Sequence, residues 1–138
     1  LKRSRDLHLK NILFLPRVKI DKIGSFLKSA DALLVHLKND PLFKITIPSK
    51  TQSYMAAGKP ILMAVKGDAA NIIKDANCGE VAEPGNPRSI ANAANFLATR
   101  NSETIKKLSQ NSLNYYSRNL SIESGIKRFI KVIELLRR

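Results

Sequence analysis

The chain has 138 residues, 43% of them hydrophobic and 25% charged, which suits one globular domain with a real core. No apolar run approaches the roughly eighteen residues that a membrane-spanning helix needs, and no secretory signal follows the basic start. The single cysteine, Cys78, excludes an internal disulfide and favours a reducing compartment, so we expect a cytoplasmic protein.

The net charge of +13 lies mainly at the two ends of the chain. Lys and Arg outnumber Asp and Glu by eight to two in residues 1–28 and by eight to three in residues 101–138, but only by eight to six between them. A field of this size attracts polyanions, either anionic lipid headgroups or nucleic acid. Individual Lys and Arg residues are explained equally well as solvent-exposed residues on helix faces that bind no polyanion.

Short apolar runs alternate with amphipathic stretches, which predicts an α/β domain with a mostly parallel sheet. The predicted strands, in chain order, are residues 11–15 (NILFL), 32–36 (ALLVH), 61–65 (ILMAV) and 79–83 (GEVAE). Apolar residues at helical spacing predict a helix over residues 20–30, between the first two strands. A long polar loop, residues 38–49, then leads to a short helix over residues 50–57 that Gly58 closes.

The later helices are predicted from their caps. Asp68 precedes a helix over residues 69–77, with Gly79 just beyond its end, and Asn86-Pro87 opens the next helix. Ser102 and Ser121 are the expected caps of the last two helices.

The last helix, residues 122–136, has an apolar stripe that we expect to pack against another surface. No internal repeat or linker interrupts the chain. We therefore predict one partial domain, with a basic lead-in over residues 1–10, an α/β core over residues 11–100 and C-terminal helices over residues 101–138.

The most specific stretch is residues 47–61, which read IPSKTQSYMAAGKPI. Ser49 followed three residues later by Gln52 has the spacing of a capping box, so we expect both side chains to bond to amides of the first turn. The free amides of Ser49, Lys50 and Thr51, with the helix dipole and the Lys50 charge, form a natural cradle for a phosphate. On spacing alone, a structural role is the commoner explanation of such a helix start.

Several motifs occur in one order. Ser-Ala-Asp at residues 29–31, the proline-serine-lysine and tyrosine-methionine-alanine-alanine-glycine-lysine-proline phrases at residues 48–60, and Cys-Gly-Glu at residues 78–80 follow one another before Pro84. With these motifs, residues 11–84 resemble the C-terminal domain of family 4 glycosyltransferases, retaining enzymes of two-domain GT-B architecture, and especially bacterial surface-polysaccharide enzymes. The resemblance implies a Rossmann-like three-layer domain that is incomplete at its N-terminus.

The resemblance implies a donor site for a nucleoside-diphosphate sugar. It assigns the diphosphate to Ser49, Lys50 and Thr51 at the helix start that follows Pro48. It assigns the base to Arg17 and Val18, after the first predicted strand, with backbone groups at Val18 pairing with a uracil-type edge. UDP is therefore the favoured nucleotide.

Both motif glutamates of the family are missing from this sequence. The one near the transferred sugar falls at Ile45, and the one that accepts the ribose hydroxyls falls at Ser53. A serine accepts fewer hydroxyl donors than a carboxylate does, and isoleucine accepts none. Asp40 and Lys44, in the same sugar-proximal loop as Ile45, are candidates to replace the lost contacts.

Other chemically interesting residues lie outside these motifs. His36 ends the second predicted strand, where ligands of open α/β sheets gather, although a lone histidine is more often structural. Cys78 has no histidine nearby in sequence, so a nucleophile is not expected, and Tyr115-Tyr116 is interpreted as packing. The sequence has no dinucleotide fingerprint, Walker loop or metal cluster, which excludes dehydrogenases, nucleoside triphosphatases and metalloenzymes.

The resemblance also implies two further strand–helix units before residue 11, with a glycine-rich turn and a basic pair for the diphosphate. In the strand order 3-2-1-4-5-6, those strands would separate the first strand of this chain from its second and would otherwise leave an open edge. The family's N-terminal acceptor domain is also not included, so we expect the chain alone to be inactive.

These observations predict the donor-binding half of a retaining glycosyltransferase that moves a sugar from a nucleoside-diphosphate donor, UDP-linked by preference, to a lipid-linked or polysaccharide acceptor. We expect it in the cytoplasm, at the inner membrane face, where anionic lipid is a candidate partner of the basic ends. No metal or other cofactor is implied, because a helix N-terminus and basic side chains stabilise the leaving diphosphate. The alternatives are a non-catalytic nucleotide-sugar-binding or partner module and, favoured only by charge, a nucleic-acid-binding domain; we expect no nucleic acid.

Overall fold

Strand β2 (Ile61–Ala64) is the centre of the fold, and each of its residues is buried. In the computed structural model, which describes residues 2–137, β2 pairs in parallel with β1 (Leu33–His36) and with β3 (Gly79–Val81). The sheet order is β1-β2-β3. The parallel α/β sheet that the sequence predicts is confirmed, with three of the four predicted strands. Leu1 and Arg138, which belong to the two basic ends, lie outside the described residues.

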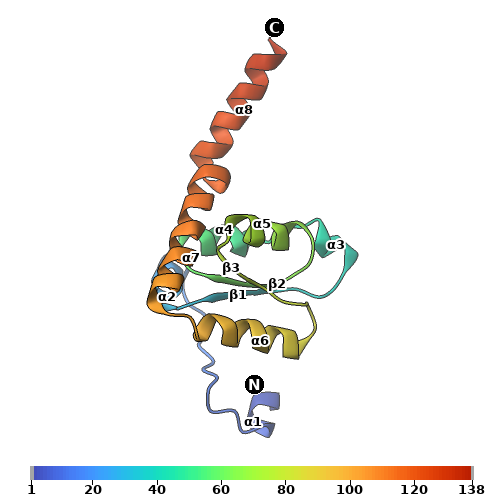
Figure 1. The fold of residues 1–138 in the computed structure, drawn as a ribbon, viewed down its shortest axis with the longest axis vertical. Helices are drawn as coiled ribbons and strands as arrows, with labels where there is room; N and C mark the ends of the chain where they lie inside the picture. Colours follow the sequence, from blue (N-terminus) through green and yellow to red (C-terminus); the bar gives the residue numbers. More distant parts are fainter. Residues whose placement is uncertain (1, 138) are drawn as a thin grey trace.

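Helices cover both faces of the sheet (Figure 1), which makes the body a three-layer Rossmann-like domain. Helices α4 (Ser49–Ala56) and α5 (Asp68–Ala76) lie on one face, and α6 (Pro87–Ala98) lies on the other. The buried cluster on the α4/α5 face contains Val35, Met55, Ile61, Met63, Val65, Ala69, Ala70, Ile73 and Cys78. The cluster on the α6 face contains Leu62, Ala64, Ala82, Ala93, Leu97 and Leu108, the last from α7 (Ser102–Tyr115).

The predicted helix caps at Asn86 and Ser121 are confirmed, and the one at Ser102 is replaced by a neighbour. Asn86 Oδ1 accepts from the Ser89 amide at 3.1 Å, and Ser121 Oγ accepts from the Ser124 amide at 3.2 Å at the start of α8 (Ile122–Leu136). Helix α7 is capped by Asn101 rather than by Ser102, because Asn101 Oδ1 accepts from the Thr104 amide at 2.8 Å.

Helix α5 has different ends from those predicted. It begins at Asp68, which is inside the helix, and its N-cap is Gly67 without a side-chain cap. It ends at Ala76, and the next residue, the C-cap Asn77, takes the left-handed conformation (φ 46°) two residues before Gly79. Asparagine tolerates this conformation better than most residues because its short polar side chain bonds locally.

The first predicted strand does not form. Residues 11–15 run as coil between the short helix α1 (Lys2–Asp6) and α2 (Ile20–Ser29), and Leu13 is 82% exposed. A strand needs a neighbour for its backbone N–H and C=O groups. Within the described residues the sheet contains only β1, β2 and β3, and residues 11–15 pair with none of them. The strand prediction was therefore wrong for this chain, and an edge of β1 is open.

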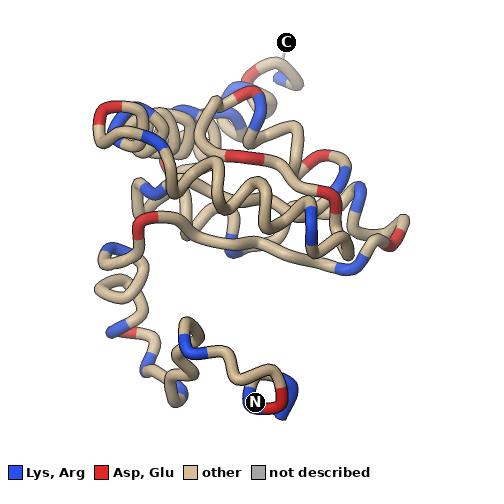
Figure 2. Tube along the Cα trace, turned by 60° about the horizontal axis from the view of Figure 1, so that its bottom comes forward, with Lys and Arg blue, Asp and Glu red and all other residues tan. Residues whose placement is uncertain are grey.

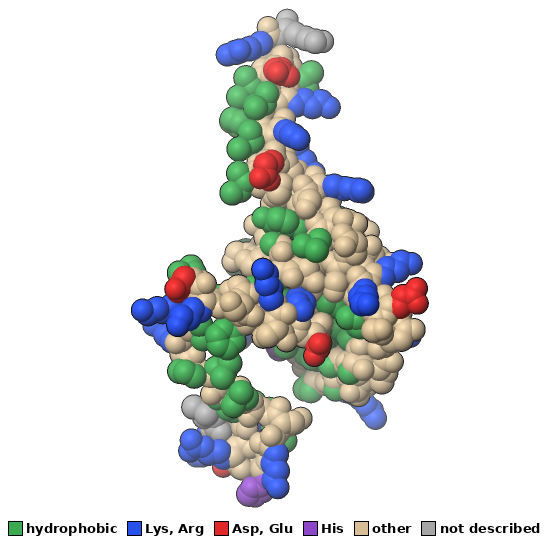
Figure 3. Space-filling model, turned by 90° about the vertical axis from the view of Figure 1, so that its left-hand side faces the viewer, with side chains coloured by type: hydrophobic (Ala, Val, Ile, Leu, Met, Phe, Trp, Pro, Cys, Tyr) green, Lys and Arg blue, Asp and Glu red, His purple; other side chains and the backbone are tan. Residues whose placement is uncertain are grey.

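Helix α8 has the predicted apolar stripe but not the predicted packing. It follows the π-helical turn η1 (Tyr116–Leu120), projects away from the body and has no buried residue (Figures 1 and 3). Its exposed apolar residues are Ile122, Ile126, Phe129, Ile130, Val132, Ile133, Leu135 and Leu136. Arg128 fixes the junction with η1, because its guanidinium donates to Asn119 Oδ1 at 2.9 Å and to the Asn119 carbonyl at 3.3 Å. We call α8 the C-terminal arm and residues 2–19 the N-terminal arm.

Candidate donor site at the start of helix α4

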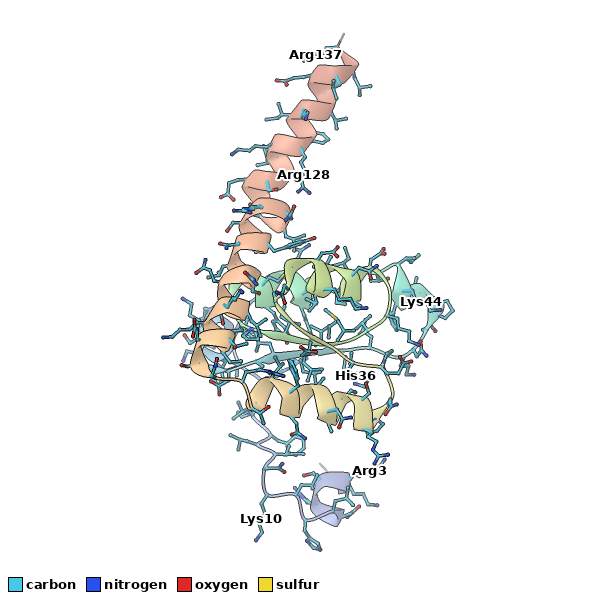
Figure 4. All side chains as sticks on the ribbon, in the orientation of Figure 1. Arg3, Lys10, His36, Lys44, Arg128 and Arg137 are labelled. Carbon is cyan, nitrogen blue, oxygen red and sulfur yellow. The ribbon has the colours of Figure 1, made fainter. Side chains whose placement is uncertain are left out.

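The start of α4 lies at the edge of the sheet where the parallel strands end. After β1 the chain forms the short helix α3 (Pro41–Lys44) inside the predicted polar loop and then turns into α4. The loop after β2 meets this segment, because Gly67 lies directly against the Lys44 carbonyl. His36 and Lys44 lie toward this edge, whereas Lys10 of the N-terminal arm lies below the body (Figure 4). This is the edge at which ligands of open α/β sheets bind.

The first turn of α4 presents unpaired backbone donors. Pro48 is the N-cap residue, in an extended conformation (φ −61°, ψ 135°), and no side chain caps the helix. The Thr51 amide donates to the Pro48 carbonyl at 2.8 Å. Within residues 2–137, no acceptor bonds to the amides of Ser49 or Lys50. Of the three amides predicted to be free, those of Ser49 and Lys50 remain open at the positive end of the helix and that of Thr51 does not.

The predicted capping box does not form. Ser49 belongs to the helix itself, and its carbonyl accepts from Ser53 Oγ at 3.4 Å, while Gln52 is exposed. The physical reason is Pro48, which occupies the cap position and brings neither an N–H nor a hydrogen-bonding side chain. The Ser49 side chain is consequently exposed beside its own open amide.

Thr51 differs from its two neighbours. Ser49 and Lys50 are exposed, whereas Thr51 is fully buried and its Oγ1 has no hydrogen-bond partner within the described residues. A buried hydroxyl without a partner costs about 1–3 kcal/mol. The three residues predicted to hold a diphosphate are thus adjacent in space, with two open to solvent and one facing the core.

The remaining predicted contacts are divided between the segment around α3 and α4 and the N-terminal arm. Asp40 caps α3, since its Oδ1 accepts from the Leu42 amide at 2.9 Å, and Lys44 ends the same helix, exposed. Ile45 follows and is 75% exposed, and Ser53 is exposed one turn into α4. In the N-terminal arm, Arg17 is exposed and Val18 is half-buried. The base-binding role of Arg17 and Val18 stays a prediction.

Sequence reasoning missed two contacts that join the loops at this edge. The Gly85 amide donates to His36 Nε2 at 3.3 Å, and Lys66 pairs with Glu83. Val35 belongs to the α4/α5 cluster, so His36, the next residue of the strand, faces α6 instead. The alternation of side chains between the two faces of a strand is the sequence signal that could have predicted this orientation. His36 is therefore on the opposite face of the sheet from α4.

Cys78 is a buried core residue. It is fully buried beneath α5, and burial raises the pKa of its thiol from 9.0 to about 11. The thiolate is the nucleophilic form of a cysteine. Because the raised pKa keeps the Cys78 thiol protonated, it is a poor nucleophile at neutral pH. Tyr115 and Tyr116 pack against the same cluster, as the sequence predicts.

Charge is spread over the molecule rather than concentrated in one patch. Lys and Arg occur on both arms and around the body (Figure 2). Among residues 2–137, no group of three His, Cys, Asp or Glu side chains is placed to hold a metal ion. Over the same residues, every helix is too short or too polar to cross a membrane.

Comparison with known proteins places this geometry in a family. The sequence profile described as "Glycosyl transferases group 1" matches residues 1–115. Sucrose-phosphate synthase from Thermosynechococcus elongatus is similar in structure, with a TM-score of 0.79 and 14% identity, over 98% of this chain and 33% of that one. The C-terminal domain of a glycosyl transferase group 1 family protein (LpcC) from Francisella tularensis is also similar, with a TM-score of 0.66 and 19% identity, over 88% of this chain and 60% of that one. No match was found among curated protein sequences.

The two solved structures establish the fold alone, because their sequence identities are low. The chain spans a third of the length of the synthase and 60% of the length of the second structure. Both support an α/β domain of the GT-B type, in agreement with the parallel sheet and its three layers. The profile covers most of the chain, including β1 to β3 and the start of α4. The chain therefore belongs to the group 1 glycosyl transferase family.

Proposed function

We propose that this chain is the donor-binding half of a glycosyltransferase and that it holds the diphosphate of a nucleoside-diphosphate sugar at the start of α4. The observation that carries the proposal is the pair of unpaired amides at Ser49 and Lys50, at the N-terminus of an eight-residue helix in a group 1 glycosyl transferase domain. The positive end of a helix dipole attracts anions, and open amides supply directed hydrogen bonds to phosphate oxygens.

The same turn also supplies the charge that transfer chemistry needs. When the sugar leaves, negative charge develops on the diphosphate, and fixed donors near that oxygen lower the barrier. The exposed Lys50 adds a full positive charge beside the two amides. The Thr51 hydroxyl faces the core instead, so the exposed groups of this turn are those of Ser49 and Lys50.

The proposal extends to a subfamily and to the rest of the enzyme. The proline-serine-lysine loop supports a retaining enzyme of family 4, of the surface-polysaccharide type, with UDP as the nucleotide. The acceptor, lipid-linked or polysaccharide, would bind a separate N-terminal domain at the cytoplasmic membrane face, so the chain alone is inactive. Its net charge of +13 favours an anionic membrane surface there.

Because both motif glutamates are missing, we propose that Ser53 makes the ribose contact. Ser53 Oγ already donates to the Ser49 carbonyl, which leaves its lone pairs to accept from a ribose hydroxyl. Ile45 contributes no polar group, so the sugar would contact Asp40 or Lys44 instead. Because one serine replaces a carboxylate, we expect UDP to depend more on the diphosphate than on the ribose for its affinity.

An NMR titration of the labelled chain with UDP, GDP and a short oligonucleotide, at two salt concentrations, tests the donor site. We expect saturable shifts with UDP, centred on the amides of Ser49 and Lys50. Lys50→Glu should weaken UDP binding at least about tenfold, equivalent to ~1.4 kcal/mol, whereas the matched reversal Lys107→Glu on α7 should leave it unchanged. Shifts with the oligonucleotide alone, lost steeply with salt, would support nucleic-acid binding and contradict the proposal.

A second experiment separates an enzyme from a non-catalytic binding module. Ser49→Pro removes one open amide but keeps the helix, because proline is well tolerated at the first helical position. In the complete gene product we expect this variant and Lys50→Glu to lose sugar transfer. Full transfer by both variants would remove the diphosphate assignment, and binding of UDP without any transfer by the wild type would favour the module.

A further inference from the structure

Gly67 is the point at which the loop after β2 touches the segment that leads into α4. It is the N-cap of α5 and has φ 79° and ψ −141°, a conformation that residues with a side chain rarely adopt. A Cβ at this position would overlap the Lys44 carbonyl oxygen and lie 2.6 Å from its carbon. The obstacle is main chain, which cannot rotate away as a flexible side chain can. Only glycine permits this approach.

The contact is made close to the proposed diphosphate site. Lys44 is the last residue of α3, and residues 45–48 connect it to Ser49. This connecting segment is held at both ends, because Thr46 Oγ1 donates to the Leu42 carbonyl at 2.7 Å and the Thr51 amide donates to the Pro48 carbonyl at 2.8 Å. A displacement of the Lys44 main chain is therefore carried into the first turn of α4.

We propose that Gly67 is a positioning residue for the donor site: its contact with Lys44 sets where the open amides of Ser49 and Lys50 point. This inference rests on the proposed function. Gly67 does not touch the donor itself. It acts through the segment of residues 45–48, and the Lys66–Glu83 ion pair ties the same loop to the one after β3.

The chain offers a matched control at Gly85. Gly85 also has a positive φ, 76°, but a Cβ built there meets no atom within 4 Å. Gly85→Ala therefore introduces backbone strain without an overlap, whereas Gly67→Ala introduces both. A difference between the two variants reports the contact with Lys44 and not the strained conformation.

The test compares the wild type, Gly67→Ala and Gly85→Ala by NMR, first without ligand and then with UDP. We expect the ligand-free resonances of the Ser49 and Lys50 amides to shift in Gly67→Ala and to stay in place in Gly85→Ala. UDP affinity should fall at least tenfold in the first variant and less than twofold in the second. Unshifted amides in Gly67→Ala, or equal losses of affinity in both variants, would overturn the proposal.

A second variant covers the case in which Gly67→Ala does not fold. Thr46→Val removes the hydrogen bond to Leu42 and leaves Gly67 intact, so we expect a smaller loss of UDP affinity, about threefold, with shifted Ser49 and Lys50 amides. No effect of Thr46→Val would then overturn the positioning role. If the wild type does not bind UDP, the proposed function fails, while the ligand-free shifts still decide whether Gly67 positions the turn.

Discussion

Two short apolar runs of this chain differ in burial and in secondary structure. Residues 61–65 contain strand β2 and are buried, with Ile61 and Met63 at 0% exposure. Residues 11–15 contain four apolar residues of five but run as coil, with Leu13 at 82% and Phe14 at 51% exposure. The difference is in their neighbours, because β2 is hydrogen-bonded to a strand on each side. An apolar run therefore indicates a segment that favours burial, but whether it forms a buried strand depends on the strands beside it.

The helices repeat this contrast between body and arms. Helix α5 is amphipathic and buries Ala69, Ala70 and Ile73, whereas α8 is amphipathic and buries nothing. The candidate donor site belongs to the body, where α3, α4 and the loop after β2 are packed together. Substitutions should accordingly be costly in the body and nearly neutral in the arms.

The largest expected effect comes from truncating a central core residue. Met63→Ala should lower the free energy of unfolding by about 2–5 kcal/mol, because it leaves a cavity in the middle of the sheet. Leu13→Ala, in the N-terminal arm, should change it by less than about 0.5 kcal/mol. Urea denaturation of both variants measures the difference, and equal losses would contradict the separation of body from arm.

Two glycines, one in the body and one in α8, differ in the space around them. A Cβ on Gly79 would overlap the backbone of Ile61 in the neighbouring strand, whereas nothing lies within 4 Å of one on Gly125 in α8. Gly79→Ala should destabilise the protein by about 1–3 kcal/mol through overpacking. Gly125→Ala should raise the helicity of α8, with up to about 1 kcal/mol of gain. Circular dichroism with thermal melting checks both, and a destabilising Gly125→Ala would show that α8 is packed after all.

The pH dependence of stability reports on Cys78. Its thiol has a pKa of about 11 in the folded chain against an ordinary 9.0. Below pH 9 the thiol is neutral in both the folded and the unfolded chain, so its burial stabilises the fold in full. Between those values the unfolded chain loses the proton and the folded chain keeps it, so unfolding becomes easier as pH rises. The stability advantage of wild type over Cys78→Ala should shrink by about 1 kcal/mol from pH 7 to pH 10. A constant advantage across that range would mean that the thiol is not desolvated.

The smallest effect is expected on the exposed stripe of the C-terminal arm. Phe129 is 68% exposed, so Phe129→Ser should change the free energy of unfolding by less than about 0.5 kcal/mol. The matched change Phe43→Ser, at a half-buried position against the α4/α5 cluster, should cost more. If the two variants melt alike, the stripe on α8 is covered in solution.

Local signals predicted much of this fold. Strands β1 to β3 follow from short apolar runs, and the caps at Asn86 and Ser121 follow from residue type at a helix start. The cap of α7 was wrong by one residue because Asn101 and Ser102 are adjacent polar residues that compete for it. The ends of α5 were wrong by a residue or two because Gly67 takes the N-cap without a side-chain bond and Asn77 takes the left-handed C-cap. The strand at residues 11–15 was wrong because pairing depends on a partner elsewhere in space.

The helix start that forms the candidate site was predicted in position but not in detail, and the role of its residues stays a prediction. The position of the α4 start and the exposure of Ser49 and Lys50 agree with the sequence motif. The buried Thr51 side chain, and the bond from its amide to Pro48, depend on how the first turn packs, which no spacing rule specifies. The contact between Gly67 and Lys44 joins residues that are far apart in sequence, so only the folded chain reveals it.

Site-resolved hydrogen exchange, with and without UDP, tests the central claim that a folded body carries the donor site. We expect slow exchange for the amides of β2 in both conditions and fast exchange for residues 11–15. With UDP, new protection should appear at Ser49 and Lys50, whose amides have no acceptor within residues 2–137. Saturating UDP that binds the chain but leaves both amides in fast exchange would contradict the placement of the diphosphate at the start of α4.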